Sequence, residues 1–326
     1  MIRHLSLFVR MMRLKVVVTL WTFLLIGLAR HTTQLTSPRL GAALLALGAG
    51  YAAATTANDI ADVGIDRLNR PRDRGRPLVT GDASIADLWR TNAFAAGVAM
   101  VAAIPLGIVG LVIVASSLLV SYAYSVGPIR LSHRWVLAPI ALSFAYVAIP
   151  YALGVAIAGG RWDRGDVPIV TGLFILFVAR IVLKDLRDRL GDERFGKPTV
   201  LLRLGKQETC VLSMAGAALG ATVLIAGLRI PASLSLLIAL CVFGIEWMLV
   251  RLRRTDDERS EQVCVGIAAR AGNGVLLATL AVLILRGQSA DDRTLVTIVG
   301  CLIAVFVVSF LDAALHPEGV RIGYKA

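Results

Sequence analysis

The sequence predicts an all-α, polytopic transmembrane helical bundle with nine or ten spans. Hydrophobic residues make up 57% of the 326 positions and charged residues only 17%, whereas about a quarter of a soluble domain is usually charged. The apolar residues gather in long uncharged runs, each near the ~20 residues that cross the hydrocarbon core of a bilayer. Composition and patterning together indicate an integral membrane protein.

Ten apolar runs define the expected spans, although the stretch 91–126 could divide at another point. The first run follows a basic, somewhat amphipathic segment without a small-residue cleavage site, so we interpret it as a retained span. The runs are 15–30, 39–57, 91–107, 109–126, 135–158, 167–183, 209–228, 231–250, 270–286 and 294–314.

The distribution of basic residues predicts the orientation. If the spans alternate, 26 of the 34 Lys and Arg residues lie in the N-terminus, the loops 58–90, 127–134, 184–208 and 251–270, and the C-terminal tail. Arg180 lies at an adjoining span end, and seven lie on the other side. Cytoplasmic loops carry the Lys/Arg excess. We therefore expect both termini and the long loops to be cytoplasmic.

The net charge of +12 does not indicate a nucleic-acid partner. The charges lie in short loops between apolar runs, and no basic stripe is interleaved with aromatic residues that could stack on bases. The four cysteines have neither CxxC spacing nor histidine partners, so we interpret them as small buried apolar residues.

Two clusters of aspartates have the same spacing. The first Asp motif (Asp59, Asp62, Asp66) and the second Asp motif (Asp185, Asp188, Asp192) both place carboxylates at i, i+3 and i+7. On a continuous helix such residues fall within roughly a 60° arc. Four further spans separate the motifs, so both are expected on the same side of the membrane.

Three carboxylates on one helical face repel one another unless a cation is present. Hard oxygen ligands suit Mg²⁺, which retains several waters and completes its shell with substrate phosphate. Two facing stripes would thus bind a diphosphate through metal and neutralise a leaving group. The simpler alternative is a solvated loop in which neighbouring arginines, such as Arg67, Arg70, Arg187 and Arg189, pair with the aspartates.

Basic segments follow both motifs. Arginine binds phosphate with a planar fork and lysine as a point charge. We expect most of these residues only to set the membrane topology, and we expect Arg76 and Lys184 to bind substrate.

With these motifs, the sequence resembles the UbiA superfamily of intramembrane prenyltransferases. The resemblance covers roughly residues 10–230 and rests on Asn58 with the first Asp motif, on Arg76-Pro77-Leu78-x-x-Gly81, and on the second Asp motif. Tyr124 and Ser125, which precede Arg130, look like the element that this family carries between the two motifs.

The resemblance implies a helical bundle around a central cavity with cytoplasmic cap loops. We expect a single domain over 1–326, with motif-bearing halves at about 10–134 and 135–250 and C-terminal spans in 270–314. Members of the family mostly have nine spans, so a tenth implies an elaborated C-terminal region or a miscount of the last two runs.

The resemblance also implies the site residues. Mg²⁺ would be held by Asn58, Asp62, Asp66, Asp188 and Asp192. The catalytic set would be Asp62, Asp66, Asp188, Asp192 and Tyr124. Substrate would contact Arg76, Lys184, Ser125, Arg130, Asp59 and Asp185.

The function implied is Mg²⁺-dependent transfer of a polyprenyl group from an isoprenyl diphosphate to a small, lipophilic or aromatic acceptor in the membrane lipid. Three alternatives stay open: a terpene cyclase that uses no acceptor, a polyprenyl-phosphate phosphoribosyltransferase, and, from another class, a cation transporter. Arginine outnumbers lysine 29 to 5, which is typical of a GC-rich genome and favours a bacterial plasma membrane.

Overall fold

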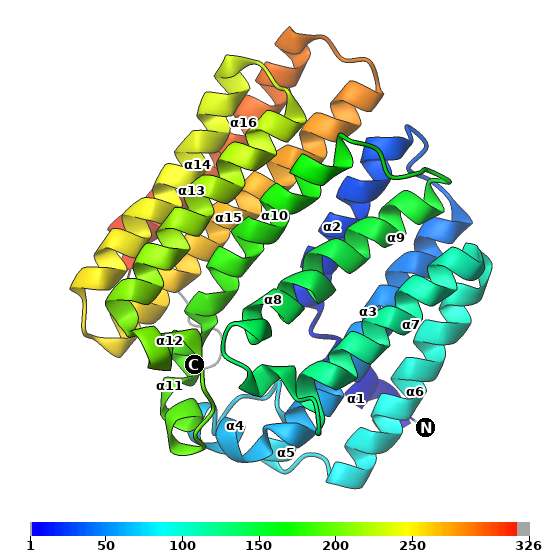
Figure 1. Cartoon of the computed structure of the whole chain (residues 1–326), viewed down its shortest axis with the longest axis vertical. Coiled ribbons are helices and arrows are strands. Elements are labelled where there is room, and N and C mark those ends of the chain that lie inside the picture. Colours follow the sequence, from blue (N-terminus) through cyan, green and yellow to red (C-terminus); the bar gives the residue numbers. More distant parts are fainter. Residues whose placement is uncertain (1, 318–326) are drawn as a thin grey trace. The chain divides into compact units, whose positions relative to one another are not determined.

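A computed structural model of the chain describes residues 2–317, which contain helices and no strand. These helices form two compact units (Figure 1). Among the described residues, the first unit comprises 2–161 together with Asp188–Thr199, and the second comprises Trp162–Arg187 and 200–317. The expected single domain with two motif-bearing halves stays a prediction.

The first unit is built around α3 (Pro38–Ala61). The helices α1 (Ile2–Met12), α6 (Ile85–Ala103), α7 (Gly107–Ser125) and α9 (Ile149–Ile157) all pack against it. Its buried positions are mostly small residues, among them Ala43, Ala49 and Ala52 with no exposed surface. Small side chains let helices approach closely within a membrane, where the hydrophobic effect does not drive them together.

Glycine allows the closest crossing in this unit, between α2 (Leu14–His31) and α9. A β-carbon at Gly154 would overlap the carbonyl oxygen of Leu24, and one at Gly27 would overlap the carbonyl oxygen of Tyr151. The two backbones are therefore in direct contact. Between α7 and α9 lie the short helices η2 (Leu131–His133), α8 (Leu137–Ser143) and the π-helix η3 (Phe144–Ala148).

The second unit contains four long helices that follow α10 (Asp166–Ile181). They are α13 (Lys206–Leu228), α14 (Ala232–Arg254), α15 (Glu258–Gly287) and α16 (Asp292–Leu315). The first of them, α13, packs against α10, where a β-carbon at Gly172 would lie 2.6 Å from the backbone nitrogen of Leu224. The last three, α14, α15 and α16, pack against one another.

Nine helical stretches in residues 2–317 are long and apolar enough to cross a membrane, and one of them is Ile85–Ser125. That stretch consists of α6 and α7, which are separated by the 3-10 helix η1 (Ile104–Leu106). Helix α7 begins at Gly107, whose φ is 77°. Because α6 and α7 pack against each other and both against α3, the chain reverses at Gly107. When α6 and α7 are counted separately, residues 2–317 contain the ten apolar segments that the sequence predicts.

Short helices carry Asp66 of the first Asp motif, the loop that follows it and the whole second Asp motif. After α3 come α4 (Val63–Asn69) and α5 (Pro77–Thr80). In the second unit, α10 continues through η4 (Val182–Lys184) into α11 (Asp185–Arg194), and α12 (Val200–Leu204) precedes α13. From Asp188 onward, the residues of α11 belong to the first unit.

Candidate active site

The first Asp motif does not lie on one continuous helix, so the predicted uninterrupted stripe is wrong there. Helix α3 ends at Ala61, and Asp62 stands between α3 and α4 with φ −108° and ψ 16°. These angles fall in the sparsely populated bridge region, where many active-site residues lie. The backbone N–H of Asp62 still donates to the carbonyl of Asn58, and the carbonyl of Asp62 accepts from the N–H of Asp66, both at 2.9 Å. Asp62 therefore keeps both of its backbone hydrogen bonds at the break.

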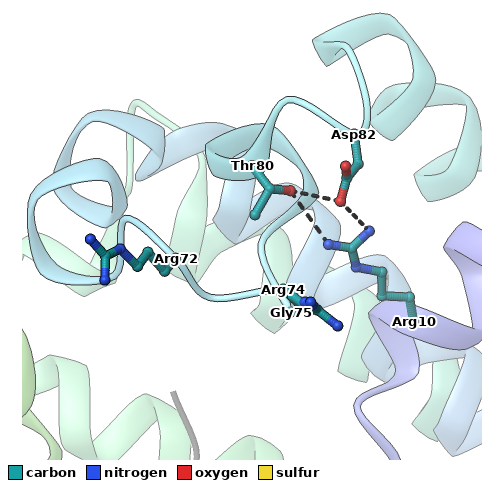
Figure 2. A pocket seen from close by; sticks show the side chains of 6 residues that line it. All are labelled: Arg10, Arg72, Arg74, Gly75, Thr80 and Asp82. Carbon is teal, nitrogen blue, oxygen red and sulfur yellow. Dashed lines mark hydrogen bonds and ion pairs between the residues drawn. The ribbon is translucent and has the colours of Figure 1, made fainter. Parts of the chain in front are cut away.

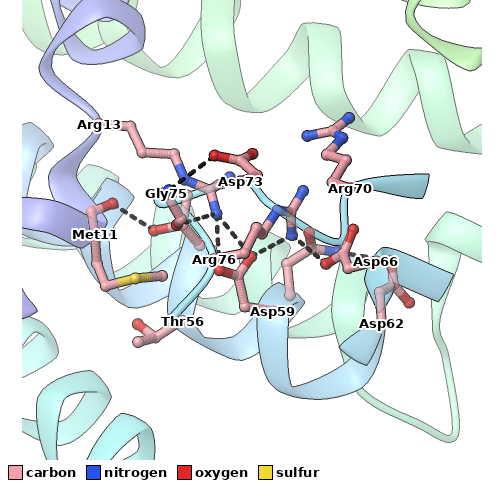
Figure 3. Close-up of polar contacts among 12 residues, drawn as sticks. Met11, Arg13, Thr56, Asp59, Asp62, Asp66, Arg70, Asp73, Gly75 and Arg76 are labelled. Carbon is pink, nitrogen blue, oxygen red and sulfur yellow. Dashed lines mark hydrogen bonds and ion pairs between the residues drawn. The ribbon is translucent and has the colours of Figure 1, made fainter. Parts of the chain in front are cut away.

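Two buried carboxylates of the first motif are bound by arginines from outside the motif (Figure 3). Arg13 Nη2 donates to both oxygens of Asp59, at 2.9 and 2.8 Å. Arg76 Nη1 lies 2.5 Å from Asp59 Oδ1 and also donates to Asp66. Arg76 itself is 6% exposed, so its charge is committed to these two aspartates.

The third aspartate of this motif, Asp62, has partners from two other segments. Arg130 Nη2 lies 3.1 Å from Asp62 Oδ1, and Asn58 Nδ2 donates to Asp62 Oδ2 at 3.1 Å. Both Arg13 and Arg130 adopt left-handed backbone angles, with φ of 44° and 39°. Such angles cost an L-residue roughly 1–2 kcal/mol and cluster at functional sites.

Within the first unit, the residues of α11 from Asp188 onward lie against α4. Asn69 Nδ2 donates to the carbonyl of Asp188 at 2.8 Å, and Asn69 Oδ1 accepts from the N–H of Gly191 at 2.7 Å. A β-carbon at Gly191 would lie 2.7 Å from the carbonyl oxygen of Ile65. The glycine within the second motif therefore permits its close approach to the first.

Two cations of the first unit contact the second motif, and one of them also contacts the first motif. Arg70 Nη2 lies 2.5 Å from Asp188 Oδ1. Lys197 Nζ lies 3.3 Å from Asp62 Oδ2 and 3.5 Å from Asp192 Oδ1, so one ammonium group contacts a carboxylate from each motif.

The surroundings shift the pKa values of Asp62 and Asp66 in opposite directions. Burial works to raise the pKa of Asp62, but Lys197 and Arg130 hold that pKa below its ordinary value. Burial raises the pKa of Asp66 to about 7, although Arg76 opposes the rise. These surroundings favour the ionised form of Asp62 and work toward the protonated form of Asp66.

The remaining predicted residues fall in two groups. Ser125, which is 2% exposed, and the half-buried Tyr124 end α7 in the unit that holds Arg130. Lys184 and Asp185 belong to the second unit, where Lys184 Nζ lies 2.8 Å from Asp185 Oδ1. Whether these residues bind substrate stays a prediction.

Three residues that contact the motifs had no predicted site role: Arg13, Arg70 and Lys197. Arg70 and Lys197 lie in the basic segments after each motif, but nothing in the pattern separates them from their neighbours. Arg13 lies 46 residues before its partner Asp59 and carried no signal. In the simpler alternative, arginines near each motif pair with the aspartates of that motif. Arg70 lies 118 residues from its partner Asp188, whereas Asp185 pairs with the neighbouring lysine Lys184.

These residues fit a bound Mg²⁺. Carboxylate oxygens are the ligands that this ion prefers, and Lys197 shows that one cation can contact Asp62 and Asp192 together. The ligand set expected from the sequence, Asn58, Asp62, Asp66, Asp188 and Asp192, lies entirely within the first unit.

A surface hollow of about 630 Å³ lies on the loop that carries Arg76 (Figure 2). Its lining includes the exposed Arg72 and Arg74. It also includes Arg10, whose Nη1 lies 2.8 Å from Asp82 Oδ2. Because Arg10 belongs to α1, this ion pair joins the N-terminal helix to the loop.

Comparison with known proteins identifies the family. The model of the UbiA prenyltransferase family matches residues 19–265. A digeranylgeranylglyceryl phosphate synthase from Methanoculleus marisnigri is 30% identical over 212 residues, which are 64% of this chain and 72% of the relative. The corresponding enzyme from Methanoregula boonei is 33% identical over 167 residues, which are 50% and 56%.

Solved structures show the same fold. One is described as giving structural and mechanistic insights into digeranylgeranylglyceryl phosphate synthase in membranes, with a TM-score of 0.64, 18% identity, and coverage of 86% of this chain and 99% of that one. A UbiA homologue from Archaeoglobus fulgidus, bound to DMAPP and Mg²⁺, has a TM-score of 0.56, 16% identity, and coverage of 93% and 97%. The protein is an integral membrane prenyltransferase, and the chain belongs to the UbiA prenyltransferase family.

Proposed function

We propose that this prenyltransferase moves a polyprenyl group from an isoprenyl diphosphate to an acceptor hydroxyl, with Mg²⁺ held by Asn58, Asp62, Asp66, Asp188 and Asp192. The observation that carries the proposal is that Lys197 contacts Asp62 and Asp192 with the same ammonium group. Carboxylates of both motifs are therefore close enough to share a cation. Relatives of the same fold bound to DMAPP and Mg²⁺ support the ligand class.

In the proposed reaction, the bond between the allylic carbon and the diphosphate oxygen breaks, and the diphosphate leaves with the electron pair. The acceptor oxygen forms the new carbon–oxygen bond and releases its proton to solvent. Bound Mg²⁺ would neutralise the leaving diphosphate. Arg76 and Arg130 position the aspartates and place positive charge beside the leaving group, where charge develops in the transition state.

The acceptor that we propose is a glyceryl phosphate lipid. The relatives at 30% and 33% identity are named for a product of this type. The family resemblance favoured an aromatic acceptor, so an aromatic acceptor is the alternative to test against the glyceryl phosphate lipid. We also propose that the two motifs lie on the cytoplasmic side, because the basic loops gather on their side of the membrane.

The test uses the purified full chain in lipid nanodiscs, with labelled geranylgeranyl diphosphate and Mg²⁺. Three incubations are compared: no acceptor, a geranylgeranyl glyceryl phosphate, and a phenolic acid. A labelled ether lipid in the second incubation alone supports the proposal. A cyclic hydrocarbon without acceptor would instead make the chain a cyclase, and product only with the phenolic acid would replace the acceptor.

A binding experiment tests the site separately from the chemistry. Binding of a non-hydrolysable diphosphate analogue should require Mg²⁺ and should be lost in Asp62→Ala and in Asp188→Ala. The matched control is Asp256→Ala, which removes a fully exposed carboxylate that pairs with Lys206. Unchanged binding in both site variants would refute the proposed metal site.

A further inference from the structure

Lys197 is a buried lysine between two buried carboxylates. It follows α11 and is anchored there, because its backbone N–H donates to the carbonyl of Asp192 at 2.8 Å. The side chain is 9% exposed, and those of Asp62 and Asp192 are 6% and 0% exposed. All three residues lie in the first unit. The ammonium group thus stands where carboxylates of the two Asp motifs converge.

Electrostatics explains why this position needs a cation. Carboxylates withdrawn from water are strongly unfavourable unless an opposite charge compensates them. Arg13 and Arg76 already compensate Asp59, and Arg70 compensates Asp188. For Asp62, Lys197 shares the task with Arg130. Asp192, which has no exposed surface, lies beside the same ammonium group.

The type of cation also matters. Arginine holds carboxylates through a rigid planar fork, whereas lysine offers a compact point charge on a flexible four-carbon stem. A lysine can therefore withdraw without any change of the backbone. Among the cations that contact the motif aspartates within the first unit's described residues, Lys197 is a lysine and Arg13, Arg70, Arg76 and Arg130 are arginines.

We propose that Lys197 is a built-in counter-ion that holds Asp62 and Asp192 together in the metal-free protein and competes with Mg²⁺ for these two carboxylates. This inference rests on the proposed function, because it requires that both aspartates bind the metal. The lysine preorganises the site at the expense of metal affinity. It is a positioning residue that sets how much metal the enzyme needs.

The direction of the effect distinguishes this role from an ordinary structural one. Loss of Lys197 removes the competitor, so the variant should bind divalent metal more tightly, by about tenfold. The same loss takes one positive charge away from two buried carboxylates, so the metal-free variant should unfold at a temperature several degrees lower. Saturating metal should restore most of that difference, because the metal replaces the lost charge.

The experiment compares the wild type with Lys197→Met and Lys197→Gln as full chains in nanodiscs. Mn²⁺ serves as the probe, and free Mn²⁺ is followed by electron paramagnetic resonance during titration. Thermal unfolding is measured in EDTA and with saturating Mg²⁺. The glutamine variant keeps a hydrogen-bond donor beside the carboxylates and provides the measurement if the methionine variant does not fold.

Lys206→Met is the matched control. Lys206 Nζ also bridges two carboxylates, at 3.1 Å from Asp256 Oδ1 and 3.0 Å from Glu261 Oε1, but it belongs to the second unit. Its loss should lower the unfolding temperature without any rescue by metal, and Mn²⁺ affinity should be unchanged. Lys197→Arg keeps the charge and should bind Mn²⁺ no more tightly than the wild type.

The outcomes separate this inference from the proposed function. If the wild type binds Mn²⁺ but the neutral Lys197 variants bind it equally or more weakly, the competition is refuted and the proposed function stands. If the wild type binds neither Mn²⁺ nor the diphosphate analogue, the proposed function itself fails. Tighter binding in the neutral variants, with metal rescue that Lys206→Met lacks, supports the inference.

Discussion

The two Asp motifs have identical spacing but different local structures. The first is interrupted at Asp62, whereas the second lies entirely on α11. All three aspartates of the first motif are buried and held by Arg13, Arg76, Arg130 or Lys197. In the second motif, Asp185 pairs with its sequence neighbour Lys184, while Asp188 and Asp192 contact cations from elsewhere in the first unit.

The same i, i+3, i+7 spacing is therefore compatible with two backbone conformations. What the two motifs share is a group of carboxylates that lies close to cations. A regular helix can carry three carboxylates on one face, as α11 does. A break at the middle aspartate turns its carboxylate to other partners, and both arrangements provide carboxylates to a shared cation. The following experiments test whether the motifs are equivalent in function although they differ in structure.

The largest effect is expected when one aspartate of either motif loses its charge. Asp62→Asn and Asp192→Asn should each reduce prenyl transfer by about 10³-fold, because each removes a carboxylate proposed to hold the Mg²⁺ that would neutralise the leaving diphosphate. Steady-state rates at saturating Mg²⁺ measure this. If only one variant loses activity, the motifs are not equivalent.

The second largest effect is expected when Arg76 is replaced, because Arg76 bridges two aspartates of the first motif. Arg76→Met should weaken binding of the diphosphate analogue by about 100-fold, because the buried Asp66 loses the guanidinium that pairs with it. Arg13→Met should have a smaller effect, since Asp59 retains Arg76. Isothermal titration with the analogue measures both, and equal losses would show that Arg13 is as important as Arg76.

The glycines of the two motifs should differ in their tolerance of alanine. A β-carbon at Gly191 would lie 2.6 Å from Asn69 Nδ2 and 2.7 Å from the carbonyl oxygen of Ile65. One at Gly64 would meet the ring of Phe195 at 2.8 Å, and a side chain can move. Gly191→Ala should therefore destabilise the protein by about 1–3 kcal/mol, and Gly64→Ala by less. Thermal unfolding in nanodiscs compares them, and the reverse order would contradict this packing.

The smallest effect is a pH dependence that comes from the first motif. The pKa of Asp66 is raised to about 7, so its carboxyl group is mostly protonated at pH 6 and mostly ionised at pH 8. Because a protonated carboxyl does not bind metal, Mn²⁺ affinity should rise about tenfold between these pH values. The sign is opposite for stability: a raised pKa in the folded state favours folding at low pH, so metal-free stability should fall as pH rises from about 4 to 7.

That pH profile can be checked with metal titrations at constant ionic strength. Asp62 provides the internal comparison, because its pKa is lowered and it stays ionised over the same range. Affinity that is flat from pH 6 to 8 would mean that Asp66 is not a ligand or is ionised throughout.

The sequence by itself determined the membrane class, the ten apolar segments and the paired motifs. These are local properties: a run of apolar residues is readable wherever it packs, and Gly107 separates α6 from α7 close to the predicted break. The motif spacing also correctly indicated a helical face for α11. The family followed from the same local patterns and is confirmed by the match over residues 19–265.

Only the tertiary structure decided which cations meet these aspartates. Arg13 and Asp59 are 46 residues apart, and Lys197 and Asp62 are 135 residues apart, so their contact depends on how α1, α3, α4 and α11 pack. It also decided the break at Asp62 and the separate pairing of Asp185 with Lys184. The physical reason is that a buried carboxylate must be compensated by whichever cation the fold brings near, and sequence distance does not limit that choice.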